Sequence, residues 1–267
     1  MTGIDLSRAN EMRLSTQLVA VHPRRPFATS RDRTVESHST ILRIEHDGMV
    51  GLGEAKMTAD ACGGRSEPVG EYAERIEGAL GGDAFRIEQI LEDLTGQLPG
   101  CCCTRAGVDI ALHDLCGKLS GLPLYRWLGL SVEKTPLTSY TIGLASIAEM
   151  VQKVREVQDW PVLKVKVGVT GDLAAVMAVR EETDAVLRVD ANGGWSVDEA
   201  VERINRLEEY GIEFVEQPIP PGSPEGLRAV RRQTNVPIFA DEDANRSEDL
   251  PALAGCVDGV NIKLMES

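Results

Sequence analysis

No apolar segment of the sequence approaches the roughly 20 residues that a helix needs to cross a bilayer. The segment from Met1 to Arg13 also lacks the apolar stretch of a secretory signal peptide. Positive charge is scarce, with 28 Lys and Arg against 42 Asp and Glu and a formal net charge of −14. Nucleic acid and anionic membranes would repel such a surface. We therefore expect a cytoplasmic protein without a nucleic-acid or membrane partner.

Cysteine pairs of the metal-binding kind are missing as well. Cys101, Cys102 and Cys103 are contiguous, and the other three of the six cysteines are scattered. Zinc sites use CxxC-type pairs with nearby histidines, and small disulfide-stapled domains use regular cysteine spacing. We therefore expect reduced thiols, mostly as small core residues.

The first part of the chain has the pattern of an α+β domain. Strands are predicted from Arg13 to Val21 and from Thr40 to Ile44, and Asp47-Gly48 is a strong hairpin signal after the second. Apolar residues at helical spacing predict a helix from Arg105 to Leu119. Residues 1–125 are therefore assigned to an N-terminal α+β domain.

From residue 126 onward, short apolar strands alternate with helices. Their spacing of about 25 residues is that of repeated βα units, which build a parallel sheet. The pattern alone leaves a doubly wound sheet and a barrel equally open, although no glycine-rich phosphate loop follows the first strand. The helix start signals are Ser146 with Glu149, Ser196 with Glu199, and Ser223 before Pro224. The predicted strands are Leu137–Leu144, Val162–Val167, Leu187–Asp190, Glu213–Glu216, Ile238–Asp241 and Val260–Leu264.

Three successive strands end in a carboxylate, namely Asp190, Glu216 and Asp241. A single acid after a strand is more often a helix cap, but the ends of parallel strands in a barrel converge at one mouth. Three oxygen donors would meet there, and without a cation their charges would repel one another. The pattern predicts a magnesium site.

Lysines alternate with apolar residues on two of the strands. The strand period of two sends Lys164 and Lys166 to one face of their strand, and Asn261 and Lys263 to one face of another. Because the apolar faces must pack against helices, the lysines should point inward. An exposed edge strand is the alternative for either strand alone. Two such strands around three acidic strand ends favour a site in which substrate lies between two amines.

Two amines next to a cation suit proton transfer beside a carboxylate. A lysine accepts a proton only when neutral, so its pKa of about 10.4 must fall through desolvation and nearby positive charge. Lys164 beside Lys166, together with the cation, would supply that charge. A metal would stabilise the enediolate that forms when the α-proton leaves. One amine on each face would remove the proton and return it, which inverts the stereocentre.

At this point the sequence resembles the enolase superfamily, muconate-lactonising-enzyme subgroup, and most closely its dipeptide epimerases of the L-Ala-D/L-Glu epimerase type. The resemblance covers essentially the whole chain. The motifs that carry it are Ala111–Arg126, Leu163–Gly168, Arg188–Asn192, Val215-Glu-Gln-Pro218, Ala240-Asp-Glu242 and Val260–Met265.

The resemblance implies a capping domain over residues 1–125 and a (β/α)7β-type barrel over 126–267. About six barrel strands are present, so we expect a C-terminally truncated chain that is unstable and feebly active by itself. It also implies Mg²⁺ on Asp190, Glu216 and Asp241, acid/base catalysis by Lys166 and Lys263, and an electrostatic role for Lys164. The implied activity is epimerisation of dipeptides such as L-Ala-L-Glu by two-base 1,1-proton transfer.

Family members place substrate specificity in two capping-domain loops, here about residues 20–29 and 51–64. Arg24 or Arg25 could pair with a glutamate side chain of the substrate. Asp243 departs from the serine that is common in the family, which would alter hydrogen bonds around the metal ligands. Substrate contacts are further predicted from Thr138, Thr141, Asn192 and Asn261.

Other functions share the same residues. A muconate-type cycloisomerase, an o-succinylbenzoate synthase and an N-acylamino acid racemase would each keep the lysines and metal ligands, and a catalytically silent fragment is the alternative from another class. A silent protein would be expected to lose one of these residues, and none is lost. The expected partner is a small carboxylate substrate, and the sequence leaves a homo-oligomer open.

Overall fold

The computed structural model describes residues 11–24, 27–30, 33–56 and 69–265. The chain divides into two compact units. The first contains residues 1–22, 36–135 and 264–267, and the second contains residues 23–35 and 136–263. The boundary at residues 125 and 126 stays a prediction.

The first unit contains an antiparallel sheet with the order β1-β4-β5. Its strands are β1 (Arg13–Val21), β4 (Ser37–His46) and β5 (Met49–Lys56). Asp47 and Gly48, with φ of 46° and 73°, form the two-residue turn between β4 and β5. These left-handed values are those of a tight hairpin turn, so the predicted hairpin is confirmed. The first six residues of the second expected specificity loop belong to β5, and residues 57–64 of that loop lie outside the described residues.

Helix α3 (Cys102–Leu119) lies directly on β5 and contains the predicted helix. The approach depends on two glycines, because a Cβ on Gly53 would lie 1.9 Å from the Gly107 carbonyl oxygen and one on Gly51 would lie 2.1 Å from that of Ala111. Leu42, Ile44, Val108, Leu112 and Leu115 form the core between helix and sheet. The remaining helical elements are η2 (Val69–Tyr72), α1 (Ala73–Leu80), α2 (Ile87–Gln97), α4 (Leu124–Trp127) and η3 (Val132–Lys134).

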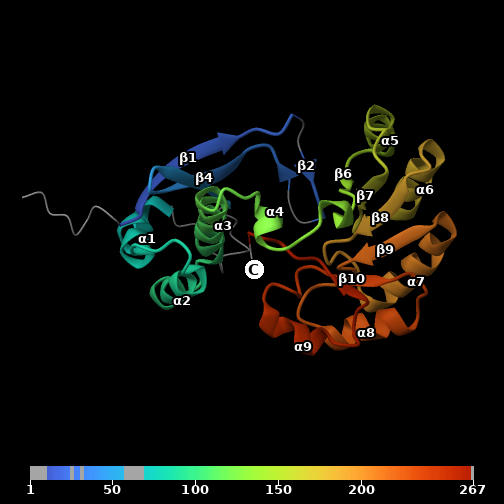
Figure 1. The fold of residues 1–267 in the computed structure, drawn as a ribbon. Coiled ribbons are helices and arrows are strands. Elements are labelled where there is room, and N and C mark those ends of the chain that lie inside the picture. Colours follow the sequence, from blue (N-terminus) through green and yellow to red (C-terminus); the bar gives the residue numbers. More distant parts are fainter. Residues whose placement is uncertain (1–10, 25–26, 31–32, 57–68, 266–267) are drawn as a thin grey trace, which may run out of the picture. The chain divides into compact units, whose positions relative to one another are not determined.

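The second unit contains a six-stranded parallel sheet with the order β11-β10-β9-β8-β7-β6. Helices α5 to α8 lie along its outer side (Figure 1). This architecture confirms the predicted α/β class. The strands are β6 (Tyr140–Ile142), β7 (Val162–Lys166), β8 (Val186–Asp190), β9 (Ile212–Glu216), β10 (Ile238–Ala240) and β11 (Gly259–Val260). The helical elements are α5 (Ile147–Glu156), α6 (Asp172–Glu182), α7 (Val197–Leu207), η4 (Glu208–Tyr210), α8 (Pro224–Arg232), η5 (Ser247–Asp249) and α9 (Leu250–Leu253).

The predicted helix starts in this unit are confirmed. The Ser146 and Ser196 hydroxyls each accept a hydrogen bond from the backbone N–H of the glutamate three residues later. The carboxylate of that glutamate in turn accepts one from the serine backbone N–H. Ser223 accepts from the backbone N–H of Gly226, and Pro224 is the first residue of α8. These capping bonds satisfy backbone donors that a helix N-terminus otherwise leaves unpaired.

The last predicted strand is shorter than expected. The sequence predicted a strand from Val260 to Leu264, whereas β11 contains only Gly259 and Val260. β11 pairs with β10 alone among the described residues, and β10 itself ends at Ala240. The ladder closes with the bond from Asn261 N to Ala240 O at 2.7 Å. Because the segment beyond has no strand neighbour there, Lys263 lies outside the strand.

Residues 23–35 belong to the second unit although they lie between β1 and β4 in the sequence. They contain the short antiparallel pair β2 (Phe27–Ala28) and β3 (Arg33–Thr34). Ala28 accepts a backbone hydrogen bond from Leu144 at 2.8 Å, and the Ser30 hydroxyl donates to the Ala191 carbonyl at 3.0 Å. Part of the first expected specificity loop therefore packs on the parallel-sheet unit.

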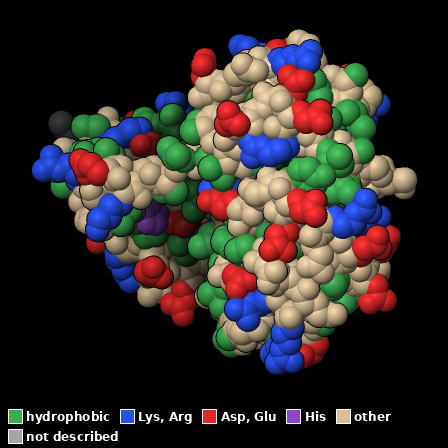
Figure 2. Space-filling view, turned by 90° about the vertical axis from the view of Figure 1, so that its right-hand side faces the viewer, with side chains coloured by type: hydrophobic (Ala, Val, Ile, Leu, Met, Phe, Trp, Pro, Cys, Tyr) green, Lys and Arg blue, Asp and Glu red, His purple; other side chains and the backbone are tan. Residues whose placement is uncertain are grey.

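The surface of the second unit carries charges of both signs. Figure 2 shows acidic and basic side chains interspersed over the viewed face, which includes outer helices of this unit. Arg155 on α5 and Glu182 on α6 form an ion pair there at 2.6 Å. In the part of the chain that the structure describes, no helix is long and apolar enough to cross a membrane.

Candidate active site

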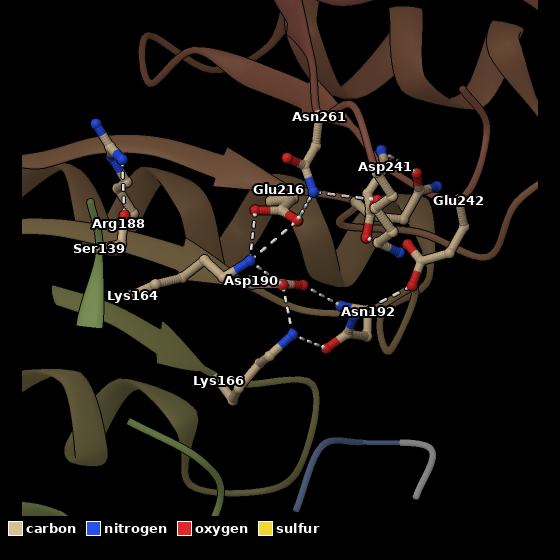
Figure 3. Close-up of polar contacts among 12 residues, drawn as sticks. Ser139, Lys164, Lys166, Arg188, Asp190, Asn192, Glu216, Asp241, Glu242 and Asn261 are labelled. Carbon is tan, nitrogen blue, oxygen red and sulfur yellow. Dashed lines mark hydrogen bonds and ion pairs between the residues drawn. The ribbon is translucent and has the colours of Figure 1, made fainter. Parts of the chain in front are cut away.

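The inward lysines are placed by the alternation of β7. Leu163 and Val165 are buried in the core with the helices, so Lys164 and Lys166 lie on the opposite face of the sheet. Lys166 is in register with Asp190 on β8, and Asp190 is in register with Glu216 on β9. The parallel register therefore brings one lysine and two carboxylates into a row (Figure 3).

Lys166 is buried and held by two side chains. Its Nζ lies 2.5 Å from Asp190 Oδ2 and 2.8 Å from Asn192 Oδ1. The Asn192 side chain donates in turn to Glu242 at 3.1 Å. Asn192 has a φ of 45°, and its backbone N–H donates to Asp190 Oδ1. The predicted substrate-binding residue Asn192 thus contacts a lysine.

Lys164 links two of the predicted metal ligands. Its Nζ lies 3.1 Å from Asp190 Oδ2 and 3.1 Å from Glu216 Oε2. Burial alone would lower the pKa of Lys164, but the negative charges of Asp190 and Glu216 outweigh burial and raise that pKa. Lys164 is therefore a cation in this arrangement.

The row continues to the third carboxylate. Asn261 donates from Nδ2 to Glu216 Oε1 at 3.1 Å and to Asp241 Oδ1 at 3.2 Å. Lys263 lies beyond β11, and its Nζ is 2.8 Å from Asp241 Oδ2. We call this chain of seven contacting residues, which has Lys166 at one end and Lys263 at the other, the polar row. In order of contact they are Lys166, Asp190, Lys164, Glu216, Asn261, Asp241 and Lys263.

The three carboxylates of the polar row are almost fully buried, with 0% exposure for Asp190, 2% for Glu216 and 4% for Asp241. Burial, followed by the charge of Asp190, raises the pKa of Glu216 to about 7. For Asp190, burial acts in the same direction, but the charges of Lys166 and Lys164 outweigh it and lower the pKa. The negative charges of these carboxylates thus depend on neighbouring cations.

Carboxylate oxygens are the donors that a hard divalent cation prefers, so the chemistry of this set fits Mg²⁺. Ammonium groups and the Asn261 amide occupy those oxygens in the structure. As the side chains stand, no group of three or more His, Cys, Asp or Glu among the described residues could hold a metal ion. Mg²⁺ would therefore compete with the ammonium groups for these carboxylates.

Gln217 supports the loops that carry Glu216 and Asp241. It lies in the Val215-Glu-Gln-Pro218 motif, but no role was predicted for it from the sequence. It is fully buried with a φ of 38°. Its Oε1 accepts from the backbone N–H of Asp241 at 3.0 Å, and its Nε2 donates to Asp243 Oδ2 at 2.8 Å. Asp243 also accepts from the Gly222 N–H at 2.6 Å. Asp243 thus joins the loops after β9 and β10. The aspartate that replaces the serine common in the family therefore has a structural role.

Two aromatic rings on β9 and β10 lie next to the polar row, each two residues before one of its carboxylates. Phe214 and Phe239 stack with centroids 4.1 Å apart, and the Arg188 guanidinium lies 5.1 Å from the Phe214 centroid. Gly259 leaves room for the stack, because a Cβ there would lie 2.6 Å from the Phe239 ring.

Among the described residues, two of the other predicted substrate contacts are exposed and a third shares a face of the sheet with Lys164. Arg24 is exposed, and Arg25 lies outside the described residues. Thr138 is exposed and precedes β6. Thr141 is in register with Lys164 and so shares its face of the sheet. A separate cavity of about 530 Å³, lined partly by Arg33, Glu149 and Lys153, includes none of the row's residues.

Two family models match the chain. Residues 13–129 match the mandelate racemase / muconate lactonizing enzyme N-terminal domain, and residues 146–267 match the enolase C-terminal domain-like family.

Curated relatives and solved structures agree with these matches. The chain is 38% identical to an L-Ala-D/L-Glu epimerase of Bacteroides thetaiotaomicron over 84% of its own length, and spans 59% of that relative. It is similar to the substrate-liganded L-Ala-D/L-Glu epimerase of Bacillus subtilis, with a TM-score of 0.89, 34% identity, and coverage of 96% of this chain and 75% of that one. A dipeptide epimerase of Enterococcus faecalis, complexed with Mg and L-Leu-L-Tyr, gives a TM-score of 0.90 at 33% identity with the same coverage.

Proposed function

Because the chain belongs to the mandelate racemase / muconate lactonizing enzyme family of the enolase superfamily, we propose that it carries the active-site residues of a dipeptide epimerase. Such an enzyme inverts the stereocentre next to the carboxylate of a dipeptide. The proposed substrate class follows from the relatives, whose names include L-Ala-D/L-Glu epimerase and hydrophobic dipeptide epimerase.

The observation that carries the proposal is the polar row with a lysine at each end. Lys166 comes from β7, whereas Lys263 follows β11, four strands away in the sheet order. Each of the two ammonium groups contacts a different carboxylate, Asp190 or Asp241. Two amines separated in this way could reach opposite faces of one α-carbon.

The proton transfer requires the two lysines to differ in protonation. Neutral Lys166 would take the α-proton from one face of the substrate, while protonated Lys263 would deliver a proton to the other face. The stereocentre is then inverted, and the lysines have exchanged their protonation states. The opposite stereoisomer uses the same pair with the roles reversed.

Asn192 would orient Lys166, and the three carboxylates of the polar row would hold the metal ion. Asn192 accepts from Lys166 and would fix the direction of its amine. Asp190, Glu216 and Asp241 would hold Mg²⁺, since their buried oxygens form a hard donor set. When bound, Mg²⁺ would supply positive charge next to the substrate carboxylate as negative charge develops there.

The test is to incubate the protein with L-Ala-L-Glu, L-Leu-L-Tyr and an N-acylamino acid in deuterated water with Mg²⁺. Proton NMR would follow loss of the α-proton signal and appearance of the second diastereomer. We expect exchange and epimerisation of a dipeptide. Exchange of the N-acylamino acid alone would refute the dipeptide assignment, and exchange of none would refute the proton-transfer assignment.

The cytoplasmic location stays a prediction.

A further inference from the structure

Asp172 is a buried carboxylate outside the polar row, and the mechanism above does not use it. It is the first residue of α6 and has 4% exposure. Its Oδ2 accepts from the backbone N–H of Gly168 at 3.0 Å, and its Oδ1 accepts from that of Val169 at 3.0 Å. One side chain thus fixes the backbone of the loop that leaves β7.

The same carboxylate also reaches the loop that leaves β8. The indole N–H of Trp195 donates to Asp172 Oδ2 at 2.9 Å, and Arg203 on α7 donates to that oxygen at 2.7 Å. Arg203 lies over the Trp195 ring, 5.6 Å from its centroid. Asp172 therefore ties together two loops that are consecutive along the sheet, with an arginine that balances its charge.

The two loops touch directly where Asp172 joins them. A Cβ on Gly194 would lie 2.5 Å from Gly168 Cα, and one on Gly168 would lie 2.5 Å from the Ala191 carbonyl oxygen. Gly168 has a φ of 102°, which a side chain would disfavour. The contact leaves little freedom for one loop to move without the other.

Lys166 and its partners stand at the starts of these two loops. Lys166 ends β7, two residues before Gly168, whereas Asp190 ends β8 and Asn192 follows it. The 2.5 Å and 2.8 Å contacts of Lys166 thus join the ends of the same two strands whose loops Asp172 joins. Lys263 follows β11 at the other end of the row, and none of the four Asp172 contacts above involves its loop.

We propose that Asp172 is a positioning residue for Lys166, holding the β7 and β8 loops at the spacing that aligns the Lys166 amine. The consequence rests on the proposed function: Asp172 should support proton transfer on the Lys166 face of the substrate and leave the Lys263 face largely unaffected. A residue needed only for folding would affect both faces alike.

The main test variant is Asp172→Asn, which keeps the shape but removes the charge and turns one acceptor into a donor. The Lys166→Ala variant first identifies the stereoisomer whose α-proton exchange depends on Lys166. For that isomer we expect Asp172→Asn to lower kcat by roughly tenfold or more, since a misplaced catalytic group costs that much, with little change in KM. Exchange of the other isomer should stay within about twofold of wild type. Asp198→Asn is the matched control, because Asp198 is an exposed acid in the first turn of the neighbouring helix α7.

A second arm does not depend on activity. Hydrogen–deuterium exchange of the 267-residue chain should show faster exchange in Asp172→Asn for peptides covering residues 166–171 and 191–196, with the β9 to β11 peptides unchanged. Trp195→Phe removes the indole donor to Asp172 and should give the same exchange pattern more weakly. This variant provides the test if Asp172→Asn does not fold.

The outcomes separate this proposal from the proposed function. Equal loss for both isomers, or unchanged exchange in the 166–171 peptides, would overturn the positioning role. If wild-type protein exchanges no substrate proton, the proposed function fails, and the amide-exchange arm still decides whether Asp172 holds the two loops.

Discussion

Lys164 and Lys166 donate to the same atom, Oδ2 of Asp190, at 3.1 and 2.5 Å. Two ammonium groups on one carboxylate oxygen repel each other, and the buried carboxylate offsets that repulsion. The protonation of Asp190 is therefore linked to the charges of both lysines. Any cation that Asp190 binds therefore competes with two ammonium groups.

Magnesium should stabilise the folded protein, and Asp190→Asn should remove most of that effect. At a Mg²⁺ concentration of 100 times its dissociation constant, the free energy of unfolding should rise by about 2.7 kcal/mol, because the ion binds only the folded state. Calorimetric unfolding with and without EDTA measures the change. Asp184→Asn, an exposed acid before β8, is the control and should respond like wild type. Equal stabilisation of wild type and Asp190→Asn would exclude Asp190 as a ligand.

Both lysines at the ends of the polar row should be essential for epimerisation. Lys166→Ala and Lys263→Ala should each abolish conversion of one diastereomer into the other, because inversion needs an acid and a base on opposite faces. Each variant should still exchange the α-proton of one isomer in deuterated water, and the two variants should retain opposite isomers. Lys134→Ala, at an exposed position in η3, should leave both reactions unchanged. Epimerisation at the wild-type rate in either row variant would rule out the two-base scheme.

Gln217→Leu should destabilise the protein by roughly 3 kcal/mol, because the backbone N–H of Asp241 and the Asp243 carboxylate would lose a buried partner. Urea denaturation gives the free energy of unfolding. Gln233→Leu is the matched control, since Gln233 is exposed and its change should stay within about 0.5 kcal/mol. A loss no larger than that of the control would show that the loops hold without Gln217.

Gly53→Ala should destabilise the first unit, whereas Gly78→Ala should stabilise it slightly. A Cβ at Gly53 would meet the Gly107 carbonyl of α3 at 1.9 Å, and helix and strand would have to separate. We expect a loss of about 1–3 kcal/mol from this overpacking. Gly78 lies in α1 with nothing within 4 Å of its Cβ position, so alanine there should add up to about 1 kcal/mol through helix propensity. Thermal unfolding of both variants is the measurement. Unchanged stability in Gly53→Ala would contradict the packing argument, and a loss in Gly78→Ala would contradict the helix-propensity argument.

Much of the fold could be predicted because its signals are local. The Asp47-Gly48 turn and the serine caps at Ser146 and Ser196 need only a few neighbouring residues to form, and all are present in the structure. The strand alternation around Lys164 and Lys166 likewise fixes their common face before any tertiary contact is known.

What the sequence could not reveal depends on distant contacts. Lys263 was expected within a strand, but the strand ends at Val260 because its only neighbour among the described residues stops at Ala240. Asp172 belongs to none of the quoted motifs, and Gln217 stands in the Val215-Glu-Gln-Pro218 motif without a predicted role. The importance of both residues comes from partners on other loops. Their signal in the sequence is weak, because a polar residue after a strand is ordinary in any turn.

The placement of residues 23–35 in the second unit has a consequence for how the chain acquires its structure. Ser30 and Ala191, which bond across this unit, are 161 residues apart in the sequence. During synthesis the β2–β3 segment therefore leaves the ribosome long before the loop that receives it exists, and such distant pairing slows folding. A gene cut between the two regions would yield a parallel-sheet fragment without its own hairpin. Supplying residues 23–35 as a separate peptide is then a direct way to ask whether that fragment can be completed in trans.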